Sequence, residues 1–169
     1  MQINTLYQLL SMSLQKSPLL DMAQTFITIP DLFNYWLSGT VTNEFTHATT
    51  TQCLDPRTRN WALPILERMG IPTHLFNPVT DSVTRVGLLA QSVAEETGAA
   101  GVQVMLPACH DTGSAVVAVP AQNQDFAWIS SGTWSIMGVE AAQPSLDEKA
   151  LQYNFTNEGG VFGTWRLSK

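Results

Sequence analysis

The chain has 169 residues, a net charge of −6 and a pI near 4.8, and 44% of its residues are hydrophobic while 13% are charged. This composition argues against a disordered protein, and it leaves no basic surface of the kind that binds nucleic acid or an anionic membrane. The two cysteines form no CxxC pair, no apolar run is long enough to span a bilayer and the N-terminus lacks the features of a signal peptide, so a cytoplasmic protein is expected.

The first seventy residues are predicted to be mainly helical. Apolar residues recur at three- and four-residue steps from Ile3 onward, which predicts a helix that ends before Pro18. Three further helices are expected, over residues 19–27, 31–37 and 61–69. Pro30 lies at the first turn of the second of these, and Gly39 follows its end. The threonine-rich stretch 40–55 is predicted to be extended and loop-like.

Strand-like sequence begins after about Gly98. The predicted elements are a strand at 101–106, a helix at 111–119, strands at 126–130 and 134–139, a loop or short helix at 143–150, and further strand at 152–167. The SGT between the two middle strands is typical of a hairpin, and Gly159-Gly160 interrupts the last. Helices followed by a strand, a helix and a hairpin predict an α/β or α+β class. The polar AQNQD indicates a domain boundary near residues 120–125.

Asp111 is the carboxylate with the clearest chemical setting. It follows His110 and opens the run Thr112–Ala115, where small side chains would let a ligand or another backbone segment approach closely. One interpretation is a helix N-cap, because an acid is favoured at a helix start. The other is a general base that faces a substrate hydroxyl. The two roles are compatible, and both stay open.

The residues next to Asp111 allow further interpretations. His110 could be a core histidine bonded to a carbonyl, or a hydrogen-bonding partner of a polyol substrate. Cys109 would allow a Cys–His nucleophile pair and hence a thiol hydrolase, but adjacent residues of an extended chain point to opposite faces, which disfavours the pair. His47 and His74 lack zinc-ligand spacing with either cysteine, so no metal ligands are expected here.

The sequence Ser130-Ser131-Gly132-Thr133 has two interpretations. It can be a simple turn in which Gly132 supplies a positive φ angle. Alternatively, exposed N–H groups and the Thr133 hydroxyl could hold a phosphate oxygen. The chain contains no GxxxxGK[ST] motif, so a nucleotide would not be held by a P-loop of that type.

Two motifs carry a family resemblance. ACHDTGSAVVAVP (Ala108–Pro120) and ISSGTW (Ile129–Trp134) resemble the catalytic-base and phosphate-contact segments of the FGGY family of carbohydrate kinases, in the version found in rhamnulokinases. The similarity runs nearly end to end and in the same order, through INTLYQLL (Ile3–Leu10), IPDLFNYWLSG (Ile29–Gly39), NEFTHATTTQCLDPRTRNW (Asn43–Trp61), GIPTHLF (Gly70–Phe76) and NFTNEGG (Asn154–Gly160). The family pattern has Asn in place of His47, and Ser or Ala near Cys109.

The resemblance implies an actin-like, ribonuclease H-like fold, in which two α/β domains close over a cleft for ATP and sugar. The chain would cover roughly the middle third of such a kinase. Residues 1–120 would form the later part of the N-terminal, sugar-binding domain. Residues 125–169 would begin the C-terminal, nucleotide-binding domain.

The resemblance also implies roles for individual residues. Asp111 would be the catalytic base, His110, Asp111 and Thr112 would line the ketose site, and Gly132 and Thr133 would contact an ATP phosphate. The implied reaction is ATP-dependent phosphorylation of L-rhamnulose at its 1-hydroxyl, with Mg²⁺ neutralising the phosphates. Neither nucleic acid nor a membrane is an expected partner, and the oligomeric state is not indicated.

Family members are longer than this chain. Their glycine-rich phosphate-binding hairpin is expected before Met1, and a substrate-contacting asparagine and the adenosine-binding half are expected after Lys169. The chain alone would then have little or no kinase activity. Two alternatives stay open: a kinase for another ketose, and a truncated, non-catalytic module that binds a partner through exposed apolar surface.

Overall fold

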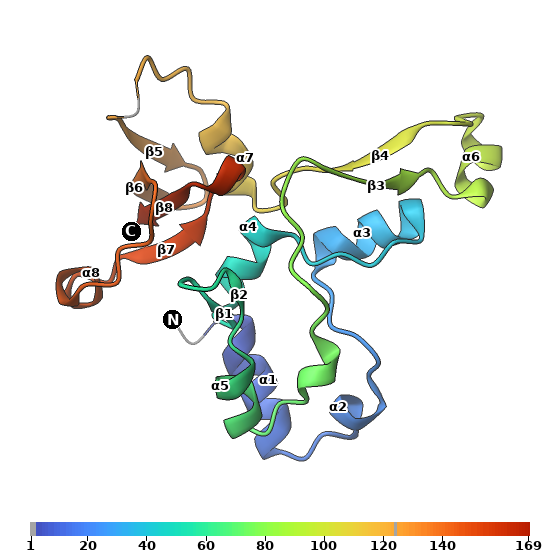
Figure 1. Ribbon diagram of the computed structural model, residues 1–169, viewed down its shortest axis with the longest axis horizontal. Helices are drawn as coiled ribbons and strands as arrows, with labels where there is room; N and C mark the ends of the chain where they lie inside the picture. Colours follow the sequence, from blue (N-terminus) through green and yellow to red (C-terminus); the bar gives the residue numbers. More distant parts are fainter. Residues whose placement is uncertain (1–2, 124) are drawn as a thin grey trace.

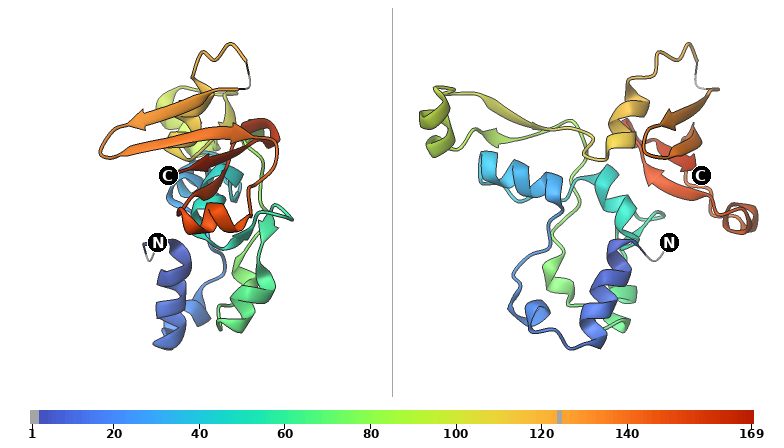
Figure 2. Two further views of the ribbon diagram at one scale, coloured as in Figure 1. Left: turned by 90° about the vertical axis from the view of Figure 1, so that its left-hand side faces the viewer. Right: turned by 180° about the vertical axis from the view of Figure 1, so that it is seen from behind.

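The computed structural model describes residues 3–123 and 125–169, and these residues form three lobes around one short central helix (Figure 1). We call them the helical lobe, the hairpin arm and the sheet lobe. Residues 1 and 2 of the first predicted domain, and Gln124 within the predicted boundary, lie outside the described residues. The views in Figure 2 show the same three-part arrangement from the side and from behind.

The helical lobe contains the apolar core. It consists of α1 (Thr5–Leu14), α2 (Pro18–Met22), β1 (Leu54–Asp55), β2 (Asn60–Trp61), α5 (Leu63–Arg68) and the 3-10 helix η2 (Thr73–Leu75). The buried core side chains are Leu9, Leu20, Ala48, Cys53, Trp61, Leu66, Ile71, Leu75 and Phe76. Burying apolar surface is the main favourable contribution to folding, so this cluster contributes strongly to the stability of the chain.

Two predicted helices of this lobe differ from those observed. The helix predicted over 19–27 ends at Met22, because β-branched residues follow and because Phe26 donates its N–H to the carbonyl of Leu75 at 2.8 Å. The helix predicted from Trp61 begins at Leu63. Trp61 instead lies in β2, where its indole N–H donates to the carbonyl of Asn77 at 2.6 Å. The first helix, predicted from Ile3, is confirmed as α1.

The hairpin arm packs one helix against a two-stranded ladder. Its elements are α3 (Ile29–Ser38), β3 (Thr84–Leu88), α6 (Gln91–Thr97) and β4 (Gln103–Leu106), with β3 and β4 antiparallel. The predicted α3 is confirmed, including Pro30 in its first turn and Gly39 at φ 74° after its end. The strand predicted at 101–106 is β4, whereas β3 and α6 were not predicted.

Residues 45–51, at the centre of the molecule, are helical, contrary to the prediction of an extended, loop-like stretch over 40–55, whereas residues 40–43 and the strand 54–55 are as predicted. α4 (Phe45–Ala48) is followed directly by the 3-10 helix η1 (Thr49–Thr51). Glu44 starts this turn, because its carboxylate accepts the N–H groups of Thr46 and His47. The threonine hydroxyls of η1 then donate to carbonyls three residues back. Side-chain bonds of this kind offset the low helix propensity of threonine.

The sheet lobe begins with α7 (Asp111–Val117) and contains a four-stranded antiparallel sheet. Its further elements are β5 (Ala127–Ser131), β6 (Ser135–Ala141), α8 (Glu148–Gln152), β7 (Thr156–Gly159), the 3-10 helix η3 (Val161–Gly163) and β8 (Trp165–Ser168). The strand order is β5-β6-β8-β7. The predicted hairpin is confirmed as β5–β6, and the break at Gly159-Gly160 separates β7 from β8.

The central helix docks onto this sheet. The rings of Phe45 and Trp165 meet edge to face with centroids 5.4 Å apart, and the N–H of Gly159 donates to the Thr49 hydroxyl at 2.8 Å. The start of α7 lies above the same junction (Figure 1). In the described residues no helix is both long and apolar enough to cross a membrane.

Candidate functional site

Asp111 lies at the start of α7 and is open to solvent. Its side chain is 95% exposed. The N-cap of α7 is His110, so the N-cap interpretation of Asp111 is wrong by one position. Asp111 is instead the first helical residue, and its Oδ1 accepts the N–H of Thr112 at 2.7 Å. A carboxylate here is favoured by the helix dipole and keeps its second oxygen available to a ligand.

The backbone before Asp111 is held from below by the central helix. The N–H of Cys109 donates to Glu44 Oε2 at 3.0 Å, and the N–H of His110 donates to the Thr46 hydroxyl at 3.1 Å. Both acceptors are fully buried. Two buried acceptors thus fix the backbone between β4 and α7 and give the next residue, Asp111, one orientation. A residue that acts on a bound molecule requires such positioning.

Glu44 is itself positioned by a second buried carboxylate. Asp31 on α3 accepts the hydroxyls of Thr28 and Thr42 at 2.7 and 2.6 Å and the N–H of Glu44 at 3.2 Å. Neither Asp31 nor Glu44 is exposed to solvent. The carboxylates are therefore satisfied by hydrogen bonds from several donors, as a buried charge needs. They connect the hairpin arm, the central helix and the segment that carries Asp111.

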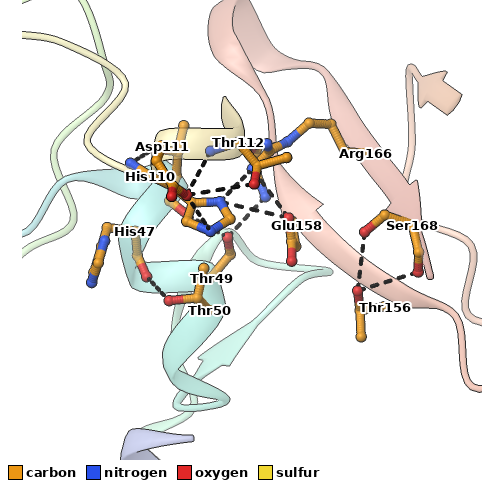
Figure 3. Close-up of polar contacts among 12 residues, drawn as sticks. His47, Thr49, Thr50, His110, Asp111, Thr112, Thr156, Glu158, Arg166 and Ser168 are labelled. Carbon is orange, nitrogen blue, oxygen red and sulfur yellow. Dashed lines mark hydrogen bonds and ion pairs between the residues drawn. The ribbon is translucent and has the colours of Figure 1, made fainter. Parts of the chain in front are cut away.

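His110 connects the same segment to the sheet. Its Nδ1 lies 3.1 Å from Arg166 Nη2 and 3.6 Å from Glu158 Oε2, and its Nε2 lies 3.4 Å from Asp111 Oδ1 (Figure 3). Burial lowers the pKa of His110 below its ordinary value. The interpretation of His110 as a core histidine bonded to a carbonyl is not what the structure shows, since its ring bonds to an arginine and faces two carboxylates.

A cavity of about 470 Å³ opens beside His110. It is lined by Ile3, Asn4, Thr49, Thr50, Gln52, Leu54, Pro56, His110, Trp134, Phe155, Thr156, Asn157 and Glu158. The two sequence motifs thus meet at one cavity, through His110 of the first and Trp134 of the second. Asp111 directly follows one of these residues and Thr133 directly precedes the other. Thr112 is buried, with its hydroxyl 3.4 Å from Asp111 Oδ1.

The turn between β5 and β6 differs from the predicted one. Gly132 is not among the residues at positive φ, so the interpretation in which it supplies that conformation is wrong. A Cβ added at Gly132 would meet no described atom within 4 Å. Its N–H donates to the carbonyl of Trp134 at 2.9 Å. The N–H of Gly132 is therefore already bonded, so a phosphate would use the N–H and hydroxyl groups of Thr133. Gly132 has no side chain that would obstruct the surface beside them.

Cys109 is unsuited to act as a nucleophile. Burial, together with the nearby charges of Glu44 and Asp31, raises the pKa of its thiol to about 12, whereas a reactive cysteine needs a lowered value. Its Sγ lies 3.8 Å from Asn34 Nδ2 and 3.7 Å from the carbonyl of Pro107. Within residues 3–123 and 125–169, no three His, Cys, Asp or Glu side chains gather as a metal site would need.

Four residues of the site were missed by reasoning from single residues: Glu44, Thr46, Glu158 and Arg166. Glu44 and Arg166 are charged yet fully buried, and the burial of a charged residue cannot be predicted from the residues next to it in the sequence. The only available signal was that they fall in or beside strings that resemble the kinase family. Each of the four contacts Cys109 or His110, which lie 48 to 65 residues away from it along the chain.

Comparison with known proteins places the chain in a family. Residues 1–118 match the FGGY family of carbohydrate kinases, N-terminal domain. Two curated relatives called rhamnulokinase, from Oceanobacillus iheyensis and Halalkalibacterium halodurans, are 43% and 44% identical over 99% of this chain. A third, from Bacteroides thetaiotaomicron, is 38% identical over 100% of it. The chain spans 35 to 36% of the length of these relatives.

Solved structures show the same fold. A ligand-bound xylulose kinase from Lactobacillus acidophilus matches 99% of the chain with a TM-score of 0.85 at 18% identity, and the chain covers 34% of it. A carbohydrate kinase from Novosphingobium aromaticivorans matches 98% with a TM-score of 0.79 at 24% identity, and the chain covers 37% of it. The predicted fold class, a partial α/β actin-like fold, is confirmed. The chain belongs to the FGGY family of carbohydrate kinases.

Proposed function

We propose that this chain works as part of a longer ATP-dependent sugar kinase that phosphorylates the 1-hydroxyl of L-rhamnulose. The 38 to 44% identity to rhamnulokinases supports this substrate. Residues 1–120 would belong to the sugar-binding domain and residues 125–169 would begin the nucleotide-binding domain. The cavity walled by both segments agrees with that division, since a kinase must bring its sugar and nucleotide together there.

Asp111 is the general base in this proposal, and the main support for that role is the environment of its side chain. The carboxylate is exposed, while the backbone behind it is fixed by Glu44 and Thr46, both fully buried. A side chain that only stabilised the helix would not need such support. An ordinary aspartate is too weak a base to deprotonate an alcohol beforehand. Asp111 would therefore orient the sugar hydroxyl and accept its proton late, as the new O–P bond forms.

The remaining predicted residues would bind the two substrates. His110 lines the cavity, where its ring would contact the sugar beside Asp111, and the Thr112 hydroxyl lies 3.4 Å from Asp111 Oδ1, close to where the sugar would bind. Thr133, with Gly132 leaving the surface open, would contact a phosphate of ATP. Phosphoryl transfer depends chiefly on such positioning and on charge stabilisation.

The side chains of this site would supply few ligands to Mg²⁺. The described part of the chain has no cage of three or more ligating side chains, and Mg²⁺ in kinases is commonly held by substrate phosphates, waters and only one or two carboxylates. The ion would therefore arrive on the phosphates of ATP. When bound, it would neutralise the charge on the transferred group.

The substrate proposal can be tested with the complete kinase that carries this chain. Purified enzyme is given Mg-ATP and, in separate assays, L-rhamnulose, D-xylulose, L-ribulose and D-fructose, and ADP release is followed. We expect the highest kcat/KM with L-rhamnulose, and phosphorus-coupled carbon NMR should place the phosphate on carbon 1. A clear preference for another ketose would support the alternative substrate, and no turnover with any sugar would contradict the kinase proposal.

A further inference from the structure

A partly buried ion pair lies behind His110. Glu158 on β7 and Arg166 on β8 are directly opposed in the antiparallel ladder, and Glu158 Oε2 lies 3.3 Å from Arg166 Nη2. Arg166 is fully buried, and its Nε donates to the carbonyl of Gly159 at 3.2 Å. The strands thus present a preformed guanidinium–carboxylate pair toward the start of α7 (Figure 3).

α7 has the space to receive this pair. A Cβ added at Gly113 would lie 3.4 Å from both terminal nitrogens of Arg166, at the short end of ordinary van der Waals contact. The first turn of α7 therefore packs directly on the flat guanidinium. Arg166 can then reach past the helix backbone to the imidazole of His110.

The contact with Arg166 fixes the protonation of the imidazole. An arginine can only donate hydrogen bonds, so His110 Nδ1 must be the acceptor in the 3.1 Å contact with Arg166 Nη2. In a neutral ring the proton then resides on Nε2. Nε2 is the atom that faces Asp111, 3.4 Å from Oδ1. The sheet lobe therefore determines which imidazole nitrogen offers a proton to the carboxylate.

We propose that Arg166 and Glu158 are positioning residues, which hold His110 as a neutral imidazole with Nε2–H toward Asp111 and so set the orientation and basicity of that carboxylate. The proposal rests on the proposed role of Asp111 as general base. A neutral imidazole orients a carboxylate through one hydrogen bond, which lowers the proton affinity of the carboxylate less than a full positive charge would. A charged one would stabilise the carboxylate anion and make it a poorer base.

The groups that face His110 have opposing effects on its charge. Burial lowers its pKa most, and the nearby Arg166 and His47 act in the same direction. The negative charges of Glu158 and Asp111 raise it. Glu158 partly offsets the effect of Arg166 on the pKa of His110. Protonation of His110 at Nδ1 would break the contact with Arg166, but the new N–H would lie 3.6 Å from the Glu158 carboxylate. The two positioning residues thus pull the titration of His110 in opposite directions.

This opposition gives a test that needs no activity. The imidazole of His110 is titrated by NMR in the chain itself, as wild type, Arg166→Gln and Glu158→Gln. Each replacement keeps a polar side chain and removes one charge. We expect Arg166→Gln to move the His110 midpoint upward and Glu158→Gln to move it downward, each by about one pH unit. His74, whose ring contacts the carbonyl of Ala23 in the helical lobe, is the internal control and should titrate unchanged.

The same variants are then assayed in the complete kinase. In the pH profile of kcat, the fall in activity at acidic pH should begin at a higher pH for Arg166→Gln and at a lower pH for Glu158→Gln, because His110 becomes charged at a higher or lower pH in these variants. The KM for ATP should change little. If Arg166→Gln does not fold, Arg166→Lys and Glu158→Gln keep the test valid. Lysine preserves the charge, so it should leave the midpoint of His110 nearly unmoved while weakening the fixed geometry.

The outcomes separate the two proposals. Midpoints of His110 that do not move, or that move in the same direction in both charge-removing variants, would overturn the positioning role. If the midpoints move as expected but the complete wild-type enzyme has no kinase activity, the proposed function fails and the electrostatic arrangement stands. If the midpoints move and the fall in kcat at acidic pH does not shift, Arg166 and Glu158 do not act through Asp111, and the proposal is overturned.

Discussion

The chemistry of the site depends on a few charged side chains whose exposures differ sharply. Asp111 is almost fully exposed, whereas Glu44 and Arg166, which hold its neighbours, are fully buried. Burying a charge is costly unless hydrogen bonds compensate for the lost hydration. Glu44 accepts hydrogen bonds from several donors, and Arg166 bonds to the carbonyl of Gly159 and the ring of His110, although its Nη1 has no partner among the described residues. These two buried charges lie on either side of the segment that carries Asp111, which is consistent with a residue held ready for reaction.

Glu44 offers a test at this scale. Its Oε2 accepts from the Thr46 hydroxyl and from the N–H groups of His47 and Cys109, and its Oε1 accepts from the N–H of Thr46 and from Ser82. In Glu44→Gln, the amide nitrogen would face donors whichever way it turned. We predict a loss of about 2–4 kcal/mol in the free energy of unfolding.

Urea denaturation of the chain measures that loss, with Glu67→Gln, at an exposed position on α5, as the matched control. The control should change stability by less than about 0.5 kcal/mol. Equal stability of Glu44→Gln and wild type would show that the buried carboxylate does not support the segment before Asp111.

At the residue scale, the sequence predicted Asp111 and His110 but not what holds them. Both stand in a motif whose composition is informative by itself. Glu44 sits in a threonine-rich stretch that reads as a loop, and its role appears only when Cys109 comes to lie beside it, 65 residues on. Buried polar partners are set by tertiary packing, and local pattern carries little information about them.

At the scale of elements, the site is a junction between α4, the start of α7 and the strands β7 and β8. The junction requires close approach, and Gly159 provides it. A Cβ there would lie 2.6 and 2.8 Å from ring carbons of Phe45. The ring is itself packed edge to face on Trp165 and covered by the guanidinium of Arg59 at 3.9 Å, so it has little freedom to move away.

We predict that Gly159→Ala lowers the free energy of unfolding by about 1–3 kcal/mol, because the added methyl overpacks the junction. Gly132→Ala is the matched control. No described atom lies within 4 Å of its added Cβ, and its φ is not in the left-handed region. The control should leave stability within about 0.5 kcal/mol of wild type.

Thermal or urea unfolding of both variants checks the comparison. A Gly159→Ala chain as stable as the Gly132→Ala chain would mean that α4 and β7 are not packed as closely as the structure has them.

The elements that the sequence predicted well are those with strong local signals. α1 and α3 have an apolar period, with prolines and a glycine near their ends, and the β5–β6 hairpin has a short polar turn between apolar runs. β3 and α6 were missed, and α2 was predicted too long. β3 contains Gly87 and has no alternation of buried and exposed residues, and α6 buries none of its residues. Neither has the periodic pattern that identifies a strand or a helix.

The whole molecule is open (Figure 1). Its apolar core cluster lies in the helical lobe and extends to Ala48 of the central helix, while further apolar side chains such as Val104 and Trp128 are buried in the other two lobes. Large apolar side chains are exposed on the other two, among them Phe33 and Trp36 on α3, and Ile129 and Met137 on the β5–β6 hairpin. Apolar surface of this extent is typical of regions that pack against further protein. It agrees with a chain that spans about a third of its curated relatives, and it makes the proposed longer kinase the right object for measurements of activity.

In the proposed function, the carboxylate of Asp111 takes the proton of the sugar hydroxyl. This role can be tested by the single-turnover rate of phosphoryl transfer from Mg-ATP to L-rhamnulose in the complete kinase, for wild type, Asp111→Asn and Asp21→Asn, a control at an exposed position. We predict that Asp111→Asn lowers this rate by at least about 100-fold while the circular dichroism spectrum and melting temperature stay unchanged, and that Asp21→Asn leaves the rate as it is. A folded Asp111→Asn enzyme that transfers phosphate at the wild-type rate would contradict the account.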